Sequence, residues 1–252
     1  TGYMANVGIL SALAGKGDII YSDELNHASI IDGCRLSRAD LVIYRHNDMA
    51  DLKEKIKAHP GRNGVIVSDG VFSMDGDIVN LPGLVELADR YGLLSMIDEA
   101  HATGVIGATG RGTEERYDME GSVDVLMGTL SNALAGEGGF VCGSRTLIDY
   151  LVNKARSFIF STSLSPVTMA AGTQGIRVIM EQPWRVQKLQ ENIRYCCAAL
   201  NSRGISAESE TAIIPIIIGD EGRAMRVMNL LKGRGYYISA IRYPTVAKGS
   251  AR

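Results

Sequence analysis

A carboxylate and an imidazole stand close together in the middle of the chain, directly after an apolar run. The residues are Asp98-Glu99-Ala100-His101, and they follow Leu93–Ile97, which has the composition of a strand buried on both faces. Open α/β sheets bind ligands beyond the carboxyl ends of their strands, where such side chains can hold a ligand or transfer a proton. A structural aspartate and a hydrogen-bonded histidine would explain the same four residues. A class of helicases also carries them, but Gly15-Lys16-Gly17 is not the phosphate loop that helicases need.

Three further segments could bind a ligand, although each also has a plain structural explanation. Gly2-Tyr3 opens an apolar helical pattern, and the free amides at a helix start suit a phosphate. His27 precedes another helical stretch, where a lone histidine is more often a cap or a surface residue. Ser73 lies in the loop Gly70–Gly76, whose glycines a simple turn would explain equally well.

A βαβ framework is needed to bring these residues together. Short apolar runs alternate with helical patterns, which predicts an α/β fold with a mostly parallel sheet. The predicted strands are Asp18–Ser22, Leu41–Arg45, Gly64–Asp69, Leu93–Asp98, Val123–Leu130 and Phe158–Thr162. The predicted helices between them include Met49–Ala58, Pro82–Tyr91 and Thr146–Arg156.

The pattern changes after Ser163, where longer helices begin. The predicted elements are two helices, Pro166–Met180 and Trp184–Arg203, then a strand, a helix and a strand at Ile213–Ile218, Ala224–Lys232 and Tyr236–Arg242. The sequence therefore predicts a large ligand-binding α/β domain over residues 1–163, a connecting helix over 164–183 and part of a smaller α+β domain over 184–252.

The composition argues against several classes of function. Of the 252 residues, 46% are hydrophobic and 21% are charged, and a net charge of −2 provides no basic surface for nucleic acid or for an anionic membrane. No apolar run approaches the ~20 residues of a membrane span. The four cysteines lack CxxC spacing, so we expect reduced thiols of a cytoplasmic protein rather than a zinc site.

Taken together, the motifs identify a family. Along the chain stand TGYxAN from Thr1, SDELNHAS from Ser22, GVFSMDGD from Gly70, DEAHATGVIGxxGRG from Asp98, GTLSxALxGEGGFVCGS from Gly128, FSTSLSP from Phe160 and AIRYPTVxKGxAR from Ala240. In this order they resemble the α-oxoamine synthases, acyl-CoA-dependent pyridoxal-phosphate enzymes of fold type I. The resemblance covers essentially the whole chain and is strongest to the member of the biotin pathway.

The resemblance implies a role for individual residues. Asp98 would hold the protonated ring nitrogen of pyridoxal phosphate, His27 would stack on the ring, and both belong to the expected catalytic set together with His101 and position 132. The expected cofactor contacts are Gly2, Tyr3 and Thr129 near the phosphate, Ser73 and His101 near the phenolic oxygen, and Ser131 and Asn132 in the loop. Ser161 and Thr162 would reach the phosphate of a partner subunit, which implies a homodimer with shared sites. Thr245 would contact substrate beside His27.

The family's chemistry is the decarboxylative condensation of an amino acid with an acyl thioester to an aminoketone. The implied substrates are L-alanine and pimeloyl-CoA, or the corresponding carrier-protein thioester. A glycine-using aminoketone synthase is the alternative, because Tyr243-Pro244-Thr245 departs from the Arg-Pro-Pro-Thr expected of the biotin-pathway enzyme.

Asn132 departs from the family at its central position. It stands where the family has the lysine that forms a Schiff base and moves the substrate proton, and an amide can do neither. We therefore expect weak, non-covalent cofactor binding, or a trapped substrate adduct, with little turnover. Three explanations compete: an altered or wrongly transcribed lysine, a natural substitution in a silent dimer partner, or a drifting pseudoenzyme. Retention of the other pocket residues favours the first.

Both ends of the sequence also depart from the family. The chain starts at Thr1 without a methionine, and a preceding segment would supply a substrate-contacting arginine and dimer surface. Arg252 ends the chain within a pattern whose next arginine would bind the substrate carboxylate. We expect the sequence to be truncated at both ends, and Arg252 itself should not be given that role.

Overall fold

The computed structural model describes all residues from 1 to 252. The chain forms two compact units, one from Thr1–Phe72 and Asp77–Leu189, the other from Ser73–Gly76 and Gln190–Arg252. The division falls inside helix α9, Trp184–Asn201. The expected domain boundaries at residues 163 and 183 stay predictions.

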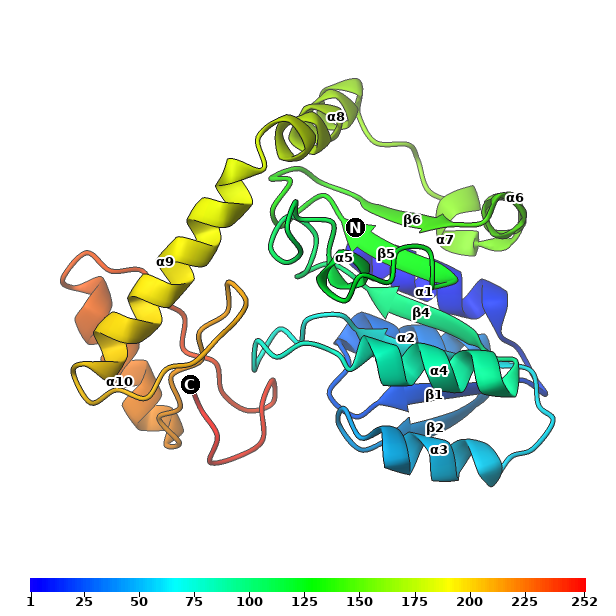
Figure 1. Ribbon diagram of the computed structural model, residues 1–252, viewed down its shortest axis with the longest axis horizontal. Coiled ribbons are helices and arrows are strands. Elements are labelled where there is room, and N and C mark those ends of the chain that lie inside the picture. Colours follow the sequence, from blue (N-terminus) through cyan, green and yellow to red (C-terminus); the bar gives the residue numbers. More distant parts are fainter. The chain divides into compact units, whose positions relative to one another are not determined.

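A six-stranded sheet forms the centre of the first unit, in the order β2-β1-β3-β4-β5-β6 (Figure 1). The strands are β1 Ile19–Asp23, β2 Asp40–Tyr44, β3 Gly64–Asp69, β4 Leu94–Asp98, β5 Val125–Thr129 and β6 Gly139–Gly143. Strands β1 to β5 pair in parallel, and β6 pairs with β5 antiparallel. The predicted α/β class with a mostly parallel sheet is confirmed.

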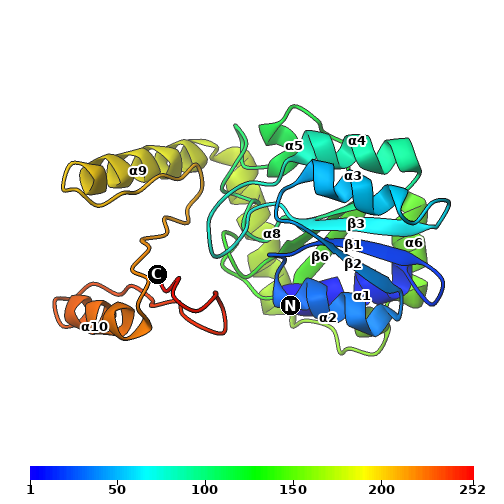
Figure 2. The same ribbon diagram turned by 90° about the horizontal axis from the view of Figure 1, so that it is seen from below.

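Helices cover both faces of this sheet (Figure 2). Helices α1, Gly2–Leu13, and α2, Ala28–Ser37, cover one face; α3, Met49–Lys57, and α4, Leu81–Tyr91, cover the other. Side chains alternate along a strand, so Met96 packs in the core under α1 and α2, whereas Ile97 packs in the core under α3 and α4. By the same alternation, Asp98 belongs to the face of α1 and α2.

The remaining helices are shorter or more exposed. They are α5 Thr113–Arg116, α6 Arg145–Lys154, α7 Arg156–Ile159, α8 Pro166–Glu181, α9 and α10 Glu221–Lys232. Side-chain oxygens cap several helix starts, such as Asp48 before α3 and Ser165 before α8, which satisfies amides that have no partner within the helix. None of the helices combines the length and apolar character that crossing a bilayer requires.

Near the sheet, one predicted strand was wrong and one strand was missed. Phe158–Thr162 is not a strand, because α7 includes its first residues and the chain beyond is irregular. The sixth strand is β6 instead, which sequence patterning missed because Gly139–Gly143 carries glycine at both ends and is only partly buried.

The two strands predicted in the C-terminal part, Ile213–Ile218 and Tyr236–Arg242, were also wrong. The extended backbone pairing there comprises a bridge between Gly219 and Ala251, a hydrogen bond from the Ile218 N–H to the Ala251 carbonyl at 2.9 Å, and two hydrogen bonds between Ile241 and Arg252, at 2.7 and 2.9 Å. An apolar extended segment becomes a strand only when a neighbouring strand takes up its amides and carbonyls. The second unit therefore contains helices and extended chain without a sheet.

Candidate functional site

A cavity of about 250 Å³ lies at the carboxyl ends of β3, β4 and β5, on the face of α1 and α2. Eight residues expected at a cofactor site line it: Gly2, Tyr3, His27, Asp98, His101, Thr129, Ser131 and Asn132. Three polar residues that the sequence did not single out, Asn6, Ser29 and Asp69, line it as well. The strand-end geometry expected from the sequence thus brings these side chains together.

Asp98 is the buried acid of the cavity, with only 4% of its surface exposed. Asn6 donates from Nδ2 to Oδ2 at 2.7 Å, and the Ala100 N–H donates to Oδ1 at 2.9 Å. Burial raises the pKa of Asp98, while the two hydrogen bonds and the nearby imidazoles of His27 and His101 lower it. A cation in the cavity would complete the stabilisation of this carboxylate.

Asp69 is a second buried carboxyl, paired in register with Asp98 on the neighbouring strand. The N–H of His27 donates to its Oδ2 at 2.7 Å, which ties the start of α2 to the end of β3. Burial and the negative charge of Asp98 raise the pKa of Asp69 well above its ordinary value. Asp69 thereby fixes the place at which His27 enters the cavity.

The two imidazoles of the cavity have different surroundings. His27 precedes α2 as its N-cap, and its Nδ1 accepts from the Ser29 N–H at 3.2 Å. His101 lies three residues after Asp98, beyond the end of β4. Burial lowers the pKa of its imidazole. Within this pocket, therefore, burial favours the uncharged form of His101.

The start of α1 forms another wall of the cavity. The first amides of a helix have no partner within it, and those of Gly2 and Tyr3 are the first of α1. A Cβ at Gly2 would come within 3.3 Å of Thr129 Cβ, so glycine lets the helix approach the end of β5 closely. Thr129 donates from Oγ1 to the Gly138 carbonyl at 2.9 Å. The free amides make this wall suitable for an anion.

Asn132 reaches the cavity from the loop that follows β5. Its Nδ2 donates to the Ala100 carbonyl at 2.7 Å, which anchors the side chain beside the chain segment that links Asp98 to His101. No lysine lines the cavity. The pocket therefore has an uncharged amide where covalent attachment of an aldehyde would need an amine.

Glu99 does not line the cavity but supports the loop beyond it. The carboxylate is 4% exposed and accepts hydrogen bonds from the N–H and the hydroxyl of Thr113. Gly112 has φ 95°, and a Cβ there would fall 1.7 Å from Glu99 Oε2, so only glycine fits. Burial raises the pKa of Glu99 to about 7. Of the tetrad, Asp98 and His101 belong to the cavity and Glu99 to its scaffold.

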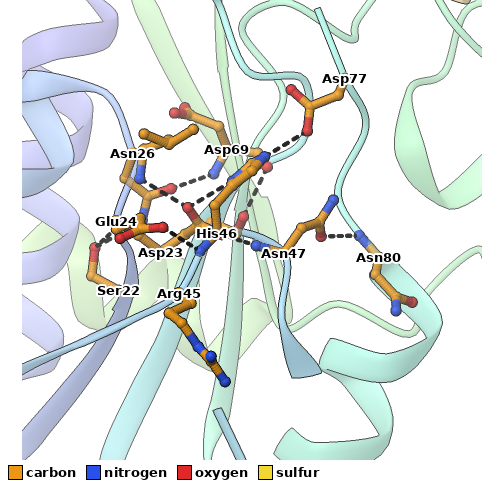
Figure 3. A network of polar contacts seen from close by, with 12 residues as sticks. Ser22, Asp23, Glu24, Asn26, Arg45, His46, Asn47, Asp69, Asp77 and Asn80 are labelled. Atoms are coloured by element: carbon orange, nitrogen blue, oxygen red, sulfur yellow. Dashed lines mark hydrogen bonds and ion pairs between the residues drawn. The ribbon is translucent and has the colours of Figure 1, made fainter. Parts of the chain in front are cut away.

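On the other face of the sheet, His46 joins two carboxylates (Figure 3). Its Nδ1 lies 3.0 Å from Asp23 at the end of β1, and its Nε2 lies 2.7 Å from Asp77. The ring also packs edge-on against Phe72, with centroids 4.5 Å apart. The hydrogen bonds to Asp23 and Asp77 raise the pKa of His46 to about 10. The imidazolium thus contacts both Phe72 and Asp77, the residues that flank the Ser73–Gly76 segment.

Asn47 forms further hydrogen bonds to the segments that flank the same loop. Its N–H donates to Asp23 at 2.8 Å, its Nδ2 donates to the Ile78 carbonyl at 2.9 Å, and its Oδ1 accepts from the Asn80 N–H at 2.7 Å. Asn47 has φ 54°, a left-handed conformation that asparagine tolerates better than most residues. His46 and Asn47 together fix the stem of the loop to the first unit.

Four expected site residues are not among those that line the cavity. Ser161 and Thr162 are exposed and do not line the cavity. Ser73 and Thr245 belong to the second unit, and their place at the site stays a prediction. Within the second unit, Thr211 Oγ1 donates to the Gly76 carbonyl at 2.8 Å, and the Arg252 guanidinium donates to Met74 O at 2.9 Å and to Asp75.

Another cavity, of about 500 Å³, lies at the amino ends of β4 and β5 among Val123, Leu126 and Leu147. Its carboxylates are already bound to the protein, since Glu114 accepts from the Val123 N–H and Asp124 from the Ser95 N–H, both at 2.8 Å. The smaller cavity is the better candidate because its polar groups converge at strand ends.

The sequence contains signals that could have identified Asn6, Ser29 and Asp69 as cavity residues. Asp69 ends an apolar strand just as Asp98 does, so the rule that found one applies to the other. Asn6 lies in the TGYxAN motif, one turn after Gly2, and Ser29 follows the histidine N-cap by two positions. Only the packing of α1 and α2 on the sheet shows that all three face the cavity.

Comparison with known proteins places these features in context. The model of the aminotransferase class I and II family matches residues 1–252. The chain is 51% identical to a putative 8-amino-7-oxononanoate synthase of Desulfovibrio desulfuricans and 48% identical to 8-amino-7-oxononanoate synthase 1 of Bacillus subtilis. Both alignments cover 100% of this chain, and the chain spans about two thirds of the relatives, 66% and 65%.

Solved structures give the same picture. Serine palmitoyltransferase from S. paucimobilis, with a bound aldimine of PLP and myriocin, superposes with a TM-score of 0.95 at 35% identity, over 100% of this chain and 64% of that one. An 8-amino-7-oxononanoate synthase from Francisella tularensis superposes with a TM-score of 0.85 at 29% identity, over 100% of this chain and 72% of that one. These matches agree with the family expected from the motifs.

Proposed function

Because the chain belongs to the aminotransferase class I and II family, we propose that it is a pyridoxal-phosphate-dependent acyltransferase of the α-oxoamine synthase type. The reaction is the decarboxylative condensation of an amino acid with an acyl thioester, with L-alanine and pimeloyl-CoA, or the carrier-protein thioester, as the favoured pair in biotin synthesis. The observation that carries the proposal is the buried carboxylate of Asp98, which faces a cavity bounded by His27 and the start of α1.

The residues present fit pyridoxal phosphate without its covalent bond. The cavity has an anion-binding wall at α1 and a buried carboxylate at Asp98, which suit the phosphate and the protonated ring nitrogen. Asn6 adds a buried Oδ1 with no hydrogen-bond partner, an acceptor that a bound group or water can satisfy. When bound, the cofactor supplies an electron-withdrawing ring that stabilises negative charge on the α-carbon of an amino acid.

Each residue then has a defined task. Asp98 would hold the ring cation, and His27 would cover the ring. The amides of Gly2 and Tyr3, with Thr129 and Ser131, would bind the phosphate. His101 would donate toward the phenolic oxygen, and the family resemblance assigns Ser73 to the same oxygen and Thr245 to the substrate.

Asn132 limits what this chain can catalyse. The amide has no basic nitrogen, so it can neither bind an aldehyde covalently nor remove the α-proton of a substrate. It is also held by the Ala100 carbonyl at 2.7 Å. We propose that the chain as written binds the cofactor non-covalently and turns over little. Asn132 also favours the second candidate function, a catalytically silent subunit of a dimer.

The homodimer is supported by apolar surface close to Ser161 and Thr162. Phe158, Phe160 and Val167 are 64%, 73% and 79% exposed, although each is a residue type that is normally buried. A run of such side chains marks a surface that another protein covers. A second copy of the chain would cover it and could bring the two hydroxyls to a neighbouring phosphate.

Borohydride reduction followed by intact mass measurement tests the proposed function. The chain, an Asn132→Lys variant and an Asn153→Lys control in α6 are each incubated with pyridoxal phosphate and reduced. We expect a single cofactor adduct only on Asn132→Lys, and aminoketone from that variant when alanine or glycine is supplied with a series of acyl-CoAs.

The outcomes separate the candidates. Absence of the adduct from Asn132→Lys would contradict the cofactor site. Aminoketone formation by the chain as written at the rate of Asn132→Lys would contradict the limiting role of residue 132. A variant that carries the adduct but forms no aminoketone with any substrate pair would favour the silent subunit.

A further inference from the structure

Two buried side chains, Asn6 and Ser29, connect the carboxylate of Asp98 to the imidazole of His27. Asn6 Nδ2 lies 2.7 Å from Asp98 Oδ2 and 2.9 Å from Ser29 Oγ, and Ser29 Oγ lies 2.7 Å from His27 Nδ1. Asn6 and Ser29 are 0% and 1% exposed. The contacts cross from β4 through α1 to α2, so the chain of hydrogen bonds joins three separate elements.

The directions of the two hydrogen bonds of Asn6 follow from the groups involved. The carboxylate of Asp98 can only accept, so the amide of Asn6 must present its NH₂ there and not its oxygen. That NH₂ has two hydrogens, and the second is donated to Ser29 Oγ. The serine hydroxyl accepts this bond and keeps its own hydrogen, which it donates to His27 Nδ1, at 2.7 Å, when that nitrogen is unprotonated.

The imidazole of His27 receives a second donor at the same atom. The Ser29 N–H points at Nδ1 from 3.2 Å, in the geometry of a helix N-cap. A nitrogen that accepts from both an amide and a hydroxyl cannot carry a proton of its own. The ring proton is then on Nε2.

We propose that Asn6 and Ser29 are positioning residues that hold His27 as the neutral imidazole with its proton on Nε2. The consequence for catalysis rests on the proposed function: a neutral ring covers the cofactor while Asp98 holds the cation of the ring nitrogen, so no second positive charge enters the pocket. Asparagine is required at position 6, because aspartate has at most one proton and cannot donate to both neighbours.

Nitrogen NMR of the imidazole rings tests the assignment on the cofactor-free chain. The protein is labelled with ¹⁵N in its histidine rings, and His27 is identified by the signals missing from His27→Gln. We expect Nδ1 to be unprotonated and Nε2 protonated in the chain as written. In Ser29→Ala, the Nδ1 resonance should move toward that of a ring without a hydroxyl donor, in Asn6→Asp it should move in the same direction, and Ser29→Thr should restore it.

The ring of His59 serves as the control, because its Nδ1 contacts the Lys55 carbonyl on α3, remote from the cavity. An unchanged His59 signal shows that a variant is folded. A proton on Nδ1 of His27 in the chain as written would overturn the proposal, and so would an unchanged Nδ1 resonance in folded Ser29→Ala. A separate titration with pyridoxal phosphate tests the proposed function, so the two can fail independently.

Discussion

At the scale of single residues, the neighbouring acids Asp98 and Glu99 at the end of β4 have different roles. Asp98 accepts from Asn6 and lines the cavity, whereas Glu99 accepts from Thr113 and fixes the loop around Gly112. The alternation of side chains along an extended chain separates them, since consecutive residues point to opposite faces. Sequence could place both acids at a strand end but could not assign Glu99 to the scaffold, because its partner lies in a glycine-rich loop of irregular structure.

The Asp98→Asn variant should weaken pyridoxal-phosphate binding by about 10- to 100-fold, the loss expected of a charge-assisted hydrogen bond. Its neutral amide cannot balance the ring cation. Fluorescence titration with the cofactor measures the effect. Asp124→Asn is the control, since Asp124 accepts from Ser95 at the other end of the sheet. Equal affinities of Asp98→Asn and the control would contradict the role of Asp98.

Glu99 should make the stability of the protein depend on pH. Its pKa in the folded state, about 7, lies above the ordinary value of 4.5, so the ionised form is disfavoured by folding. The free energy of unfolding should fall as the pH rises from 4.5 to 7, by about 3 kcal/mol for this group. In Glu99→Gln that fall should disappear. Urea unfolding at pH 5 and pH 8 measures both proteins, and parallel losses in the two would refute the assignment.

At the scale of elements, hydrogen bonds from distant residues hold the loops in place, and the hydrophobic periodicity of the sequence does not reveal them. The longer helices and the parallel strands of the first unit followed from apolar spacing, because burial on both faces of a sheet leaves a strong pattern. The short helices α5 and α7 did not. The positions of Phe72 and Asp77 instead depend on His46, which lies far away in sequence and has no local signal. The half-exposed strand β6 was missed for a related reason, since little of it is buried.

His46→Ala should loosen the loop from Phe72 to Asn80. Hydrogen bonds to charged partners contribute about 2 to 3 kcal/mol, so we expect a loss of that size in the free energy of unfolding at pH 6. The folded-state pKa is raised, so the stabilisation is complete below about 6.5 and is lost as the pH rises through about 10. The difference between His46→Ala and the original chain should therefore shrink between pH 7 and pH 10.

Hydrogen exchange of the amides from Phe72 to Asn80 gives the local readout. Asp77→Asn keeps the size of its side chain and removes one of the two carboxylates, so its exchange rates should fall between those of the original chain and His46→Ala. A pH-independent stability difference for His46→Ala would show that the imidazole acts through packing alone.

At the scale of the whole molecule, exposed apolar side chains point to self-association. Phe160 is 73% exposed, and a charge at this position should oppose burial against a second copy. We expect Phe160→Asp to weaken dimer formation by at least about tenfold, as seen by sedimentation velocity over a range of concentrations. Arg145→Asp, on the exposed start of α6, is the control. A monomeric original chain, or equal dimerisation of the variant, would contradict the dimer proposal.

The cavity also has a consequence for the order of synthesis. Every residue that lines it lies between Thr1 and Asn132, and all of them belong to the first unit. Helices α8, α9 and α10 are translated later, so the ribosome has already made the complete lining of the cavity before the C-terminal helices exist. The nascent chain thus holds every cavity residue early enough for the cofactor to assist the folding of the sheet while translation continues.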